Sequence, residues 1–236
     1  MAKAPLAGEV KTRLVPPLTP TEAAALNVCF LQDMAANVGD VADAHRASGL
    51  VVYTPVGAEA AFDGVLPEGF KLLAQRGESL GDRLCNATDD LLKQGYSSIC
   101  LINSDSPTLP RSVLDRAIEL LAHDGDRVVL GAADDGGYYL IGLKRAHRSL
   151  FDRIAWSTAE VLAHTIERAE EIGVPVELLP RWYDVDDTTT LNRLCEELFE
   201  QRQDGAYLAP HTRAFLASLI EKEGRDRICP NLLRRE

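Results

Sequence analysis

Side chains able to do chemistry in this sequence follow short apolar runs. The clearest is Asp105, which lies beyond the run 99–102 and directly before Ser106 and Pro107. Such a run indicates a strand buried on both faces of an α/β sheet, and ligands of these sheets bind beyond the carboxyl ends of the strands. A carboxylate there suits Mg²⁺ or Mn²⁺ and, through the metal, phosphate. The alternative is that Asp105 only caps a turn.

Two further acidic runs strengthen the metal hypothesis. Asp134 and Asp135 follow the apolar run 128–133, and the run 184–187 reads Asp-Val-Asp-Asp. Three acidic groups are more than turn chemistry requires, and like charges held close together repel unless a cation lies between them. The sequence therefore predicts a site for Mg²⁺ or Mn²⁺.

A loop near the N-terminus carries charges of the opposite sign. Residues 4–18 are rich in proline and glycine, and they include Gly8, Lys11 and Arg13. The loop lacks the spacing of a P-loop, and the chain contains no G-x-G-x-x-G dinucleotide motif. Cations beside an acidic metal site would neutralise a diphosphate from the side opposite the metal. The alternative is an ordinary solvated basic loop.

Composition narrows the class of protein. The 236 residues carry a formal net charge of -11, which argues against nucleic-acid or anionic-membrane partners, since both require a basic face. No apolar run reaches membrane-spanning length and the N-terminus is no signal peptide, so we expect a cytoplasmic protein; its oligomeric state is unknown. The five cysteines share no metal-ligand or redox spacing, which predicts reduced thiols and no zinc site.

Helical and strand patterns alternate along the chain. Thr19 to Glu22 forms a capping box that predicts a helix to about residue 38, and Ser157 to Glu160 predicts a second capping box before a helix to about residue 172. Further helices are expected at about 84–95, 110–121, 188–202 and 210–223, and strands at 50–53, 70–74, 99–102, 128–133, 138–143 and 175–179. This order predicts one α/β domain with a mostly parallel sheet covered by helices on both faces. Residues 1–205 would form its body, and 206–236 a C-terminal helix and tail packed on it.

Several motifs together resemble a known family. They are the segment Lys3–Leu14, Asp105-Ser106-Pro107, the segment Asp134–Gly142, Trp156-Ser157-Thr158 and Asp184-Val185-Asp186. Over residues 3–194 the chain resembles the DUF2064 family, bacterial proteins of the glycosyltransferase-A (nucleotide-diphospho-sugar transferase) superfold. The resemblance implies a Rossmann-like nucleotide-binding sheet, a divalent metal and transferase activity.

One feature departs from that family. Its members carry an apolar strand directly before the Lys-x-Pro motif, whereas Lys3 here follows only Met1 and Ala2. We therefore expect the first, central strand to be missing and the natural reading frame to begin upstream of Met1. Loss of a central strand leaves backbone groups unpaired in the core, which is unfavourable.

The resemblance also suggests roles for the acidic residues. Asp105 would bind the metal, and Asp184 or Asp186 would supply a second carboxylate. If that segment is extended, its alternation points both side chains to one side. The alternative is that the run starts a helix, where acidic residues are favoured; Asp187 could cap that helix while Asp186 binds.

The turn after residue 133 would serve the acceptor. Asp134 or Asp135 would act there as a general base or as a hydrogen-bonding group. Gly136 and Gly137 would leave room for the sugar or the acceptor. The alternative for the two glycines is a tight turn between strands.

The basic loop favours one transfer reaction over another. Lys11 and Arg13 would hold the diphosphate, and Gly8 would allow close backbone approach. A short loop with two cations suits a diphosphate whose far phosphate carries a sugar. We therefore expect a metal-dependent glycosyltransferase that uses a nucleotide-sugar and a small-molecule acceptor. The alternatives are a nucleotidyltransferase acting on an NTP and a small phosphorylated metabolite, and a non-catalytic nucleotide-binding protein.

Overall fold

The computed structural model describes residues 1–200 and 203–229. Seven strands lie in this part of the chain: β1 (Ala2–Lys3), β2 (Leu50–Thr54), β3 (Lys71–Ala74), β4 (Ile99–Ile102), β5 (Val128–Ala133), β6 (Tyr138–Leu143) and β7 (Val176–Trp182). They form a three-stranded sheet of order β1-β2-β3 and a four-stranded sheet of order β4-β6-β5-β7. Neighbouring strands are parallel except at β6, which runs antiparallel to β4 and β5. The expected α/β fold with a mostly parallel sheet is confirmed.

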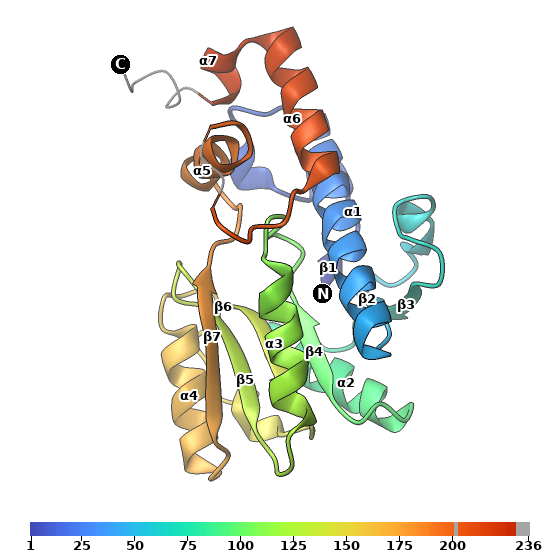
Figure 1. The fold of residues 1–236 in the computed structure, drawn as a ribbon, viewed down its shortest axis with the longest axis vertical. Coiled ribbons are helices and arrows are strands. Elements are labelled where there is room, and N and C mark those ends of the chain that lie inside the picture. The colour runs from blue at the N-terminus through green and yellow to red at the C-terminus, as the bar shows by residue number, and fades with distance from the viewer. Residues whose placement is uncertain (201–202, 230–236) are drawn as a thin grey trace.

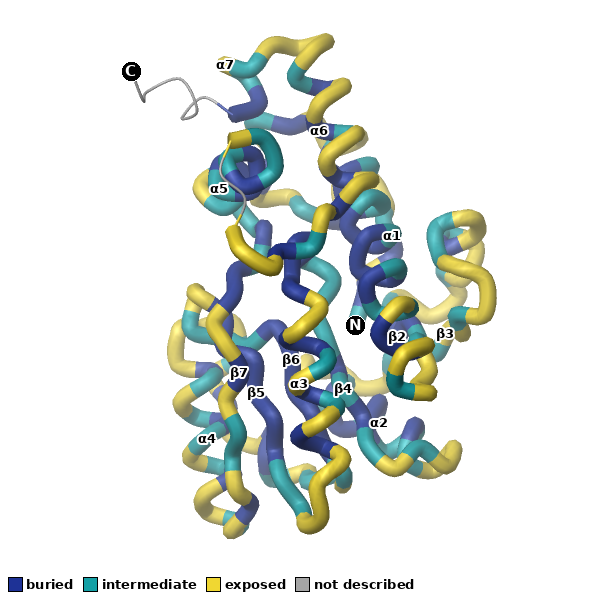
Figure 2. The backbone as a smooth tube through the Cα atoms, viewed as in Figure 1, coloured by how far each residue is buried: buried dark blue, intermediate teal, exposed yellow. Residues whose placement is uncertain are grey.

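Helices cover both faces of the larger sheet. They are α1 (Pro20–His45), α2 (Leu80–Lys93), α3 (Arg111–Ala122), α4 (Val161–Glu171), α5 (Thr188–Phe199), α6 (Pro210–Glu223) and α7 (Arg225–Ile228), with short 3-10 turns η1 (Thr12–Leu14), η2 (Glu59–Phe62) and η3 (Arg148–Phe151). Side chains of α1 and α3 share one core cluster with the sheet, and those of α2 and α4 share another. In Figure 1, α3 lies before the sheet and α4 beside β7. Figure 2 shows β5 and β6 buried along almost their whole length, as strands between two helical layers must be.

The two expected capping boxes had different outcomes. The first is confirmed, because the Thr19 side chain accepts from the Glu22 amide and the Glu22 carboxylate accepts from the Thr19 amide. The second is wrong. Ser157 has a positive φ of 64°, and the Thr158 hydroxyl donates to the Ala155 carbonyl, so the chain turns there and α4 begins later, at Val161.

The strand that the sequence suggested was missing is present in part, as β1. Its two residues pair with β2 in parallel, Ala2 with Tyr53 and Lys3 with Thr54. The amino group of Met1 then donates to the Ile102 carbonyl at the end of β4, over 2.7 Å. This bond links the residue before β1 to the larger sheet.

The C-terminal helices pack on the body of the protein. Helix α6 contacts α1, where the buried Asp33 carboxylate accepts from the amides of His211 and Thr212. Cys195 and Cys229 form a disulfide, so the expectation of five reduced thiols is wrong: the fold brings together two cysteines 34 residues apart. The predicted division at residue 205 stays a prediction, and residues 201–202 and 230–236 lie outside the described part.

Candidate functional site

A cleft of about 420 Å³ opens where β1, β2 and β4 end. Its lining includes Lys3 and Thr54, the last residues of β1 and β2, and Asn103, the first residue after β4. The loop 9–13 closes one side of it. Open α/β sheets bind ligands at this position, beyond the carboxyl ends of neighbouring strands, because the connections from those strands turn to opposite sides of the sheet.

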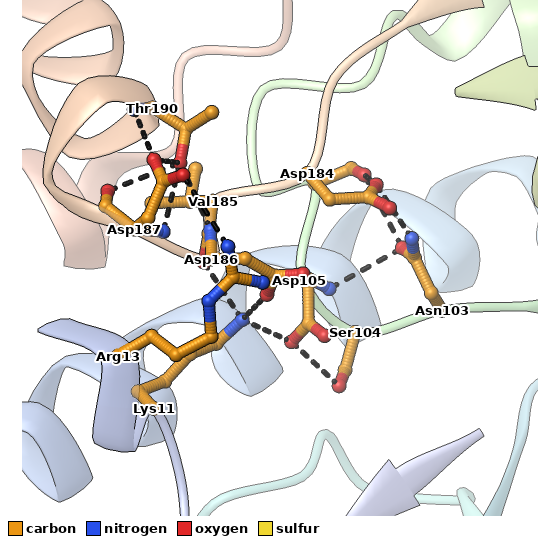
Figure 3. Close-up of polar contacts among 11 residues, drawn as sticks. Lys11, Arg13, Asn103, Ser104, Asp105, Asp184, Val185, Asp186, Asp187 and Thr190 are labelled. Carbon is orange, nitrogen blue, oxygen red and sulfur yellow. Dashed lines mark hydrogen bonds and ion pairs between the residues drawn. The ribbon is translucent and has the colours of Figure 1, made fainter. Parts of the chain in front are cut away.

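Lys11 lines the cleft and joins two acidic segments that are about eighty residues apart in sequence. Its ammonium contacts Asp105 Oδ1 at 2.8 Å and Asp186 Oδ1 at 3.0 Å. It also donates to the Val185 carbonyl over 2.8 Å. An ammonium has three donors, so all three are engaged within the protein, as Figure 3 shows.

The environment of Lys11 keeps it charged. Its side chain is only 5% exposed, and burial alone lowers the pKa of its amine, but the carboxylates of Asp105 and Asp186 outweigh burial and the pKa is raised above its usual value. The backbone of Lys11 is left-handed, with φ 48° and ψ 36°, a conformation uncommon outside glycine. The three contacts of the side chain hold the residue in that conformation.

Asp184 faces a different set of partners from Asp186. Its Oδ1 accepts from the Asn103 amide and from the Ser106 hydroxyl, both over 2.6 Å. Burial raises the pKa of Asp184 to about 6, with Asp105 and Asp186 adding to the rise and the two hydrogen bonds opposing it. Asp184 therefore supports the turn after β4, and Asp186 is the carboxylate presented to Lys11.

Asp187 and Arg13 lie at the rim. Asp187 is the N-cap of α5, its side chain accepting from the Thr190 amide over 2.9 Å, so the cap considered for it is confirmed. The Arg13 guanidinium is 3.5 Å from the Asp187 carboxylate and its side chain is 70% exposed. Arg13 is therefore a cation of this cleft with an exposed side chain that can turn toward a ligand. Gly8, with φ 81°, lies in the turn before the cleft and outside its lining.

The second acidic pair occupies the turn between β5 and β6, outside the lining of the cleft. Asp134 contacts Arg193 of α5 at 2.6 Å, and Asp135 accepts from the Gly137 amide over 2.8 Å. Gly136 has φ 90°, and a Cβ there would lie 2.1 Å from the Ala159 carbonyl oxygen. Gly136 therefore allows the turn to pack closely against Ala159, and the role of the two glycines toward a sugar or acceptor stays a prediction.

The backbone sets the distance between the two acidic sites. β4 and β5 run in the same direction with β6 between them, so at about 4.8 Å per strand their carboxyl ends lie roughly 10 Å apart. The segment 182–186 crosses this interval: the Asp134 amide donates to the Trp182 carbonyl, and the Val185 amide donates to the Asp105 carbonyl over 2.8 Å.

The donor set at the cleft suits one kind of metal ion. In residues 1–200 and 203–229, no three His, Cys, Asp or Glu side chains converge into a metal-binding group. Asp105 and Asp186 do converge, both being partly exposed and both reaching Lys11 Nζ. Mg²⁺ is commonly held by one or two carboxylates, with water and substrate phosphate completing its coordination. The pair fits such a shared ion and does not fit one held by protein alone.

Sequence reasoning missed the polar side chains that support these residues. Asn103 and Ser106 orient Asp184, and Gln75, just after β3, donates to the carbonyls of Ala2 and Val52. These three residues follow the ends of strands β4 and β3. That position, which drew attention to Asp105, could also have identified them in the sequence.

Comparison with known proteins identifies the family. A model of the family described as "Uncharacterized protein conserved in bacteria (DUF2064)" matches residues 37–158. The chain belongs to the DUF2064 family. The matched region contains Asp105 and the β5–β6 turn of this DUF2064 protein, while Lys11 and Asp186 lie outside it. No curated protein matches the chain.

Among the solved structures similar to this DUF2064 protein are two with informative titles. One is the "putative nucleotide-diphospho-sugar transferase" from Desulfovibrio desulfuricans G20, with 30% identity, a TM-score of 0.78 and 93% of each chain covered. The other is CMP:2-keto-3-deoxy-manno-octonic acid synthetase complexed with CTP, with 14% identity and a TM-score of 0.50, covering 80% of this chain and 88% of that one. The second shows likeness of fold alone. Within the described residues, no helix has the length and apolar character needed to cross a membrane.

Proposed function

We propose that this DUF2064 protein is a metal-dependent transferase that takes a nucleotide-diphospho-sugar as donor and passes the glycosyl group to a small-molecule acceptor. The observation that carries the proposal is the meeting of Lys11, Arg13, Asp105 and Asp186 at the cleft where β1, β2 and β4 end. The family and the likeness to the Desulfovibrio protein support it.

The residues of the cleft divide the work of donor binding. Asp105 and Asp186 would hold Mg²⁺ or Mn²⁺, which when bound neutralises charge on the departing nucleoside diphosphate. Lys11 holds the two carboxylates in place, since its three donors are engaged in the protein. Arg13, largely exposed, is the residue suited to bind a phosphate oxygen with its guanidinium.

The β5–β6 turn would serve the acceptor. Arg193 engages Asp134, which leaves Asp135 as the exposed carboxylate available to accept a proton or a hydrogen bond from an incoming hydroxyl. Gly137 supplies the amide that orients Asp135, while Gly136 lets the turn pack against Ala159. The interval of roughly 10 Å between the strand ends is the distance that a donor sugar and an acceptor would together have to bridge.

The test is binding and product analysis on matched variants. Nucleotides, NTPs and nucleotide-sugars are screened with and without Mn²⁺ for a rise in melting temperature, which selective binding produces by mass action. Asp105→Asn should abolish the Mn²⁺-dependent rise. Asp184→Asn, which keeps an oxygen for Asn103 and Ser106, should retain it.

The released product then decides the reaction. A glycosyltransferase liberates a nucleoside diphosphate from a nucleotide-sugar. Pyrophosphate release that requires an NTP and a phosphorylated acceptor would overturn the proposal in favour of a nucleotidyltransferase. Nucleotide binding with no product in either assay would identify a non-catalytic binding protein. An equal Mn²⁺-dependent rise in melting temperature in the wild type and in Asp105→Asn would show that Asp105 is not a metal ligand.

A further inference from the structure

One side chain at the cleft carries a hydrogen-bonding oxygen that the protein leaves unused. Asn27 of α1 lines the cleft together with Asp105 and Asp186, and only 4% of the residue is exposed. Its Oδ1 is buried and accepts no hydrogen bond from the described part of the chain. Buried carboxamide oxygens nearly always have a donor, so this exception calls for a partner from outside the chain.

The position of Asn27 on α1 is one that packing alone fills with an apolar residue. At helical spacing the same face continues with Leu31, Met34 and Val38, and both Leu31 and Met34 are buried. A buried polar group without a partner makes the folded state less stable than an apolar group of similar shape does. The stability of α1 therefore does not account for Asn27, whereas a ligand in the cleft does.

Asn27 lies near the point where the acidic residues of the cleft meet. Phe30 follows it by three residues, so the two are neighbours on the surface of α1. The centre of the Phe30 ring is 5.5 Å from Lys11 Nζ, and Lys11 contacts both Asp105 and Asp186. Under the proposed function this acidic pair holds the metal and, through it, the diphosphate. Asn27 would then face a group of the donor close to the diphosphate.

The unused oxygen of Asn27 indicates the kind of group it binds. An acceptor needs a donor, and a deprotonated phosphate has none. A hydroxyl both donates and accepts, so it serves the carboxamide whichever way the oxygen and nitrogen are turned. In a nucleotide-sugar the two rings nearest the diphosphate are the ribose and the transferred sugar, and both carry hydroxyls. The base lies one ring further away.

We propose that Asn27 is a binding residue for the donor, and that its side-chain amide hydrogen-bonds a hydroxyl of a ring next to the diphosphate. The identity of the ligand rests on the proposed function, whereas the missing partner of Oδ1 is a property of the free protein. Asn27 should therefore lower the stability of the free protein and raise its affinity for the donor. A residue that serves only the fold would not combine these two effects.

The first measurement is the melting temperature of the free protein. Asn27→Leu removes the unpaired oxygen and continues the apolar face, so it should raise the melting temperature by about 2 °C or more. The matched control is Asn37, also on α1 and fully buried, whose Nδ2 donates to the Leu109 carbonyl over 2.8 Å. Asn37→Leu should instead lower the melting temperature, because the carbonyl loses this donor.

The second measurement is affinity in the presence of Mn²⁺. UDP, GDP, ADP and CDP and their glucose esters are compared by calorimetric titration, and the ligands with the base that binds most tightly are kept. Asn27→Leu should weaken binding of the nucleotide-sugar about tenfold, and Asn37→Leu should leave it unchanged. If a ribose hydroxyl is the partner, the 2′-deoxy or 3′-deoxy diphosphate binds equally to the wild type and Asn27→Leu. If a sugar hydroxyl is the partner, the free diphosphates bind equally to both.

The opposite results overturn the proposal. Asn27→Leu that melts below the wild type would give Asn27 a structural role, and a higher melting temperature with unchanged affinity would identify an ordered water as the partner of Oδ1. Equal weakening for the nucleotide-sugar, the free diphosphate and both deoxy forms would place the base against Asn27. If Asn27→Leu does not fold, Asn27→Ala, which adds no volume, replaces it in the titration.

Failure of the proposed function is a separate outcome. A wild type that binds the nucleotide-sugar, loses affinity in Asn27→Leu and transfers no sugar would leave the role of Asn27 intact and overturn the reaction. Transfer by the wild type with equal affinity in Asn27→Leu would do the reverse. A wild type that binds none of these ligands would overturn both.

Discussion

Two buried amino groups, the Met1 amine and Lys11 Nζ, lie near the N-terminus, and their chemistry differs. Lys11 lines the cleft, and Met1 lines both the cleft and a second cavity of about 560 Å³ bordered by β2 and β4. Burial is the largest influence on each amine and lowers the pKa of each. The pKa of Lys11 nevertheless ends above its usual value, whereas that of Met1 falls to about 6.

The difference shows that partners, more than depth, decide whether a buried amine keeps its proton. Lys11 contacts two carboxylates, from Asp105 and Asp186, and a negative charge at hydrogen-bond distance favours the ammonium. Met1 donates to the Ile102 carbonyl, an uncharged acceptor that favours the ammonium less than a carboxylate does, and the charge of Asp105 opposes desolvation only in part. Its carboxylate partners keep the Lys11 amine protonated, whereas burial makes the Met1 amine lose its proton more readily.

The largest effect is expected at Lys11. Lys11→Met should lower the free energy of unfolding by about 3 kcal/mol, because it leaves two carboxylates facing each other with no cation. Urea denaturation measures the loss. Lys3→Met is the matched control: Lys3 is exposed and 3.7 Å from Glu9, so its change should stay within about 0.5 kcal/mol. Equal losses in the two variants would show that the buried contacts of Lys11 add nothing.

Met1 should produce a smaller, pH-dependent effect. Its amine falls from an ordinary pKa of 8.0 to about 6 in the folded protein, so the unfolded chain binds the proton more tightly. The free energy of unfolding must therefore rise by about 2 kcal/mol between pH 6 and pH 8. Outside that window this group adds no further pH dependence. Acetylation of the Met1 amine removes the group. Unfolding free energies of the free and acetylated chains, compared at pH 6 and pH 8, should differ in slope; parallel curves would contradict the assignment.

The smallest effect is expected at an exposed cation. Arg193 pairs with Asp134 at 2.6 Å and lies 3.8 Å over the Tyr183 ring, but both charged side chains are well exposed. Arg193→Met should therefore cost at most about 1 kcal/mol of unfolding free energy by urea denaturation. A loss of unfolding free energy as large as that from Lys11→Met would show that solvent exposure does not weaken the ion pair of Arg193 with Asp134.

Sequence patterns located the cleft because the positions of strand ends follow from the order and direction of the strands. Asp105 follows an apolar run, and parallel strands bring their carboxyl ends to one edge of the sheet. That reasoning put Lys11, Arg13, Asp105 and Asp186 in one place, and the structure brings them together. Their roles toward metal and substrate stay predictions.

Other features depend on contacts that no local pattern encodes. Asp184 and Asp186 are both acidic and two residues apart, yet only Asp186 reaches Lys11, because Asn103 and Ser106 from the turn after β4 take Asp184. The disulfide of Cys195 and Cys229 likewise depends on how the C-terminal helices pack. The second capping box failed because a turn at Ser157 has the same residue types as a helix start.

The segment 182–186 acts as a fixed spacer between the two ends of the candidate active site. Main-chain hydrogen bonds join it to Asp134 at one end and to Asp105 at the other, so its position does not depend on side-chain contacts. A change of residues in the β5–β6 turn can therefore leave the cleft around Lys11 in place. Under the proposed function, the choice of acceptor would be separated in this way from donor binding.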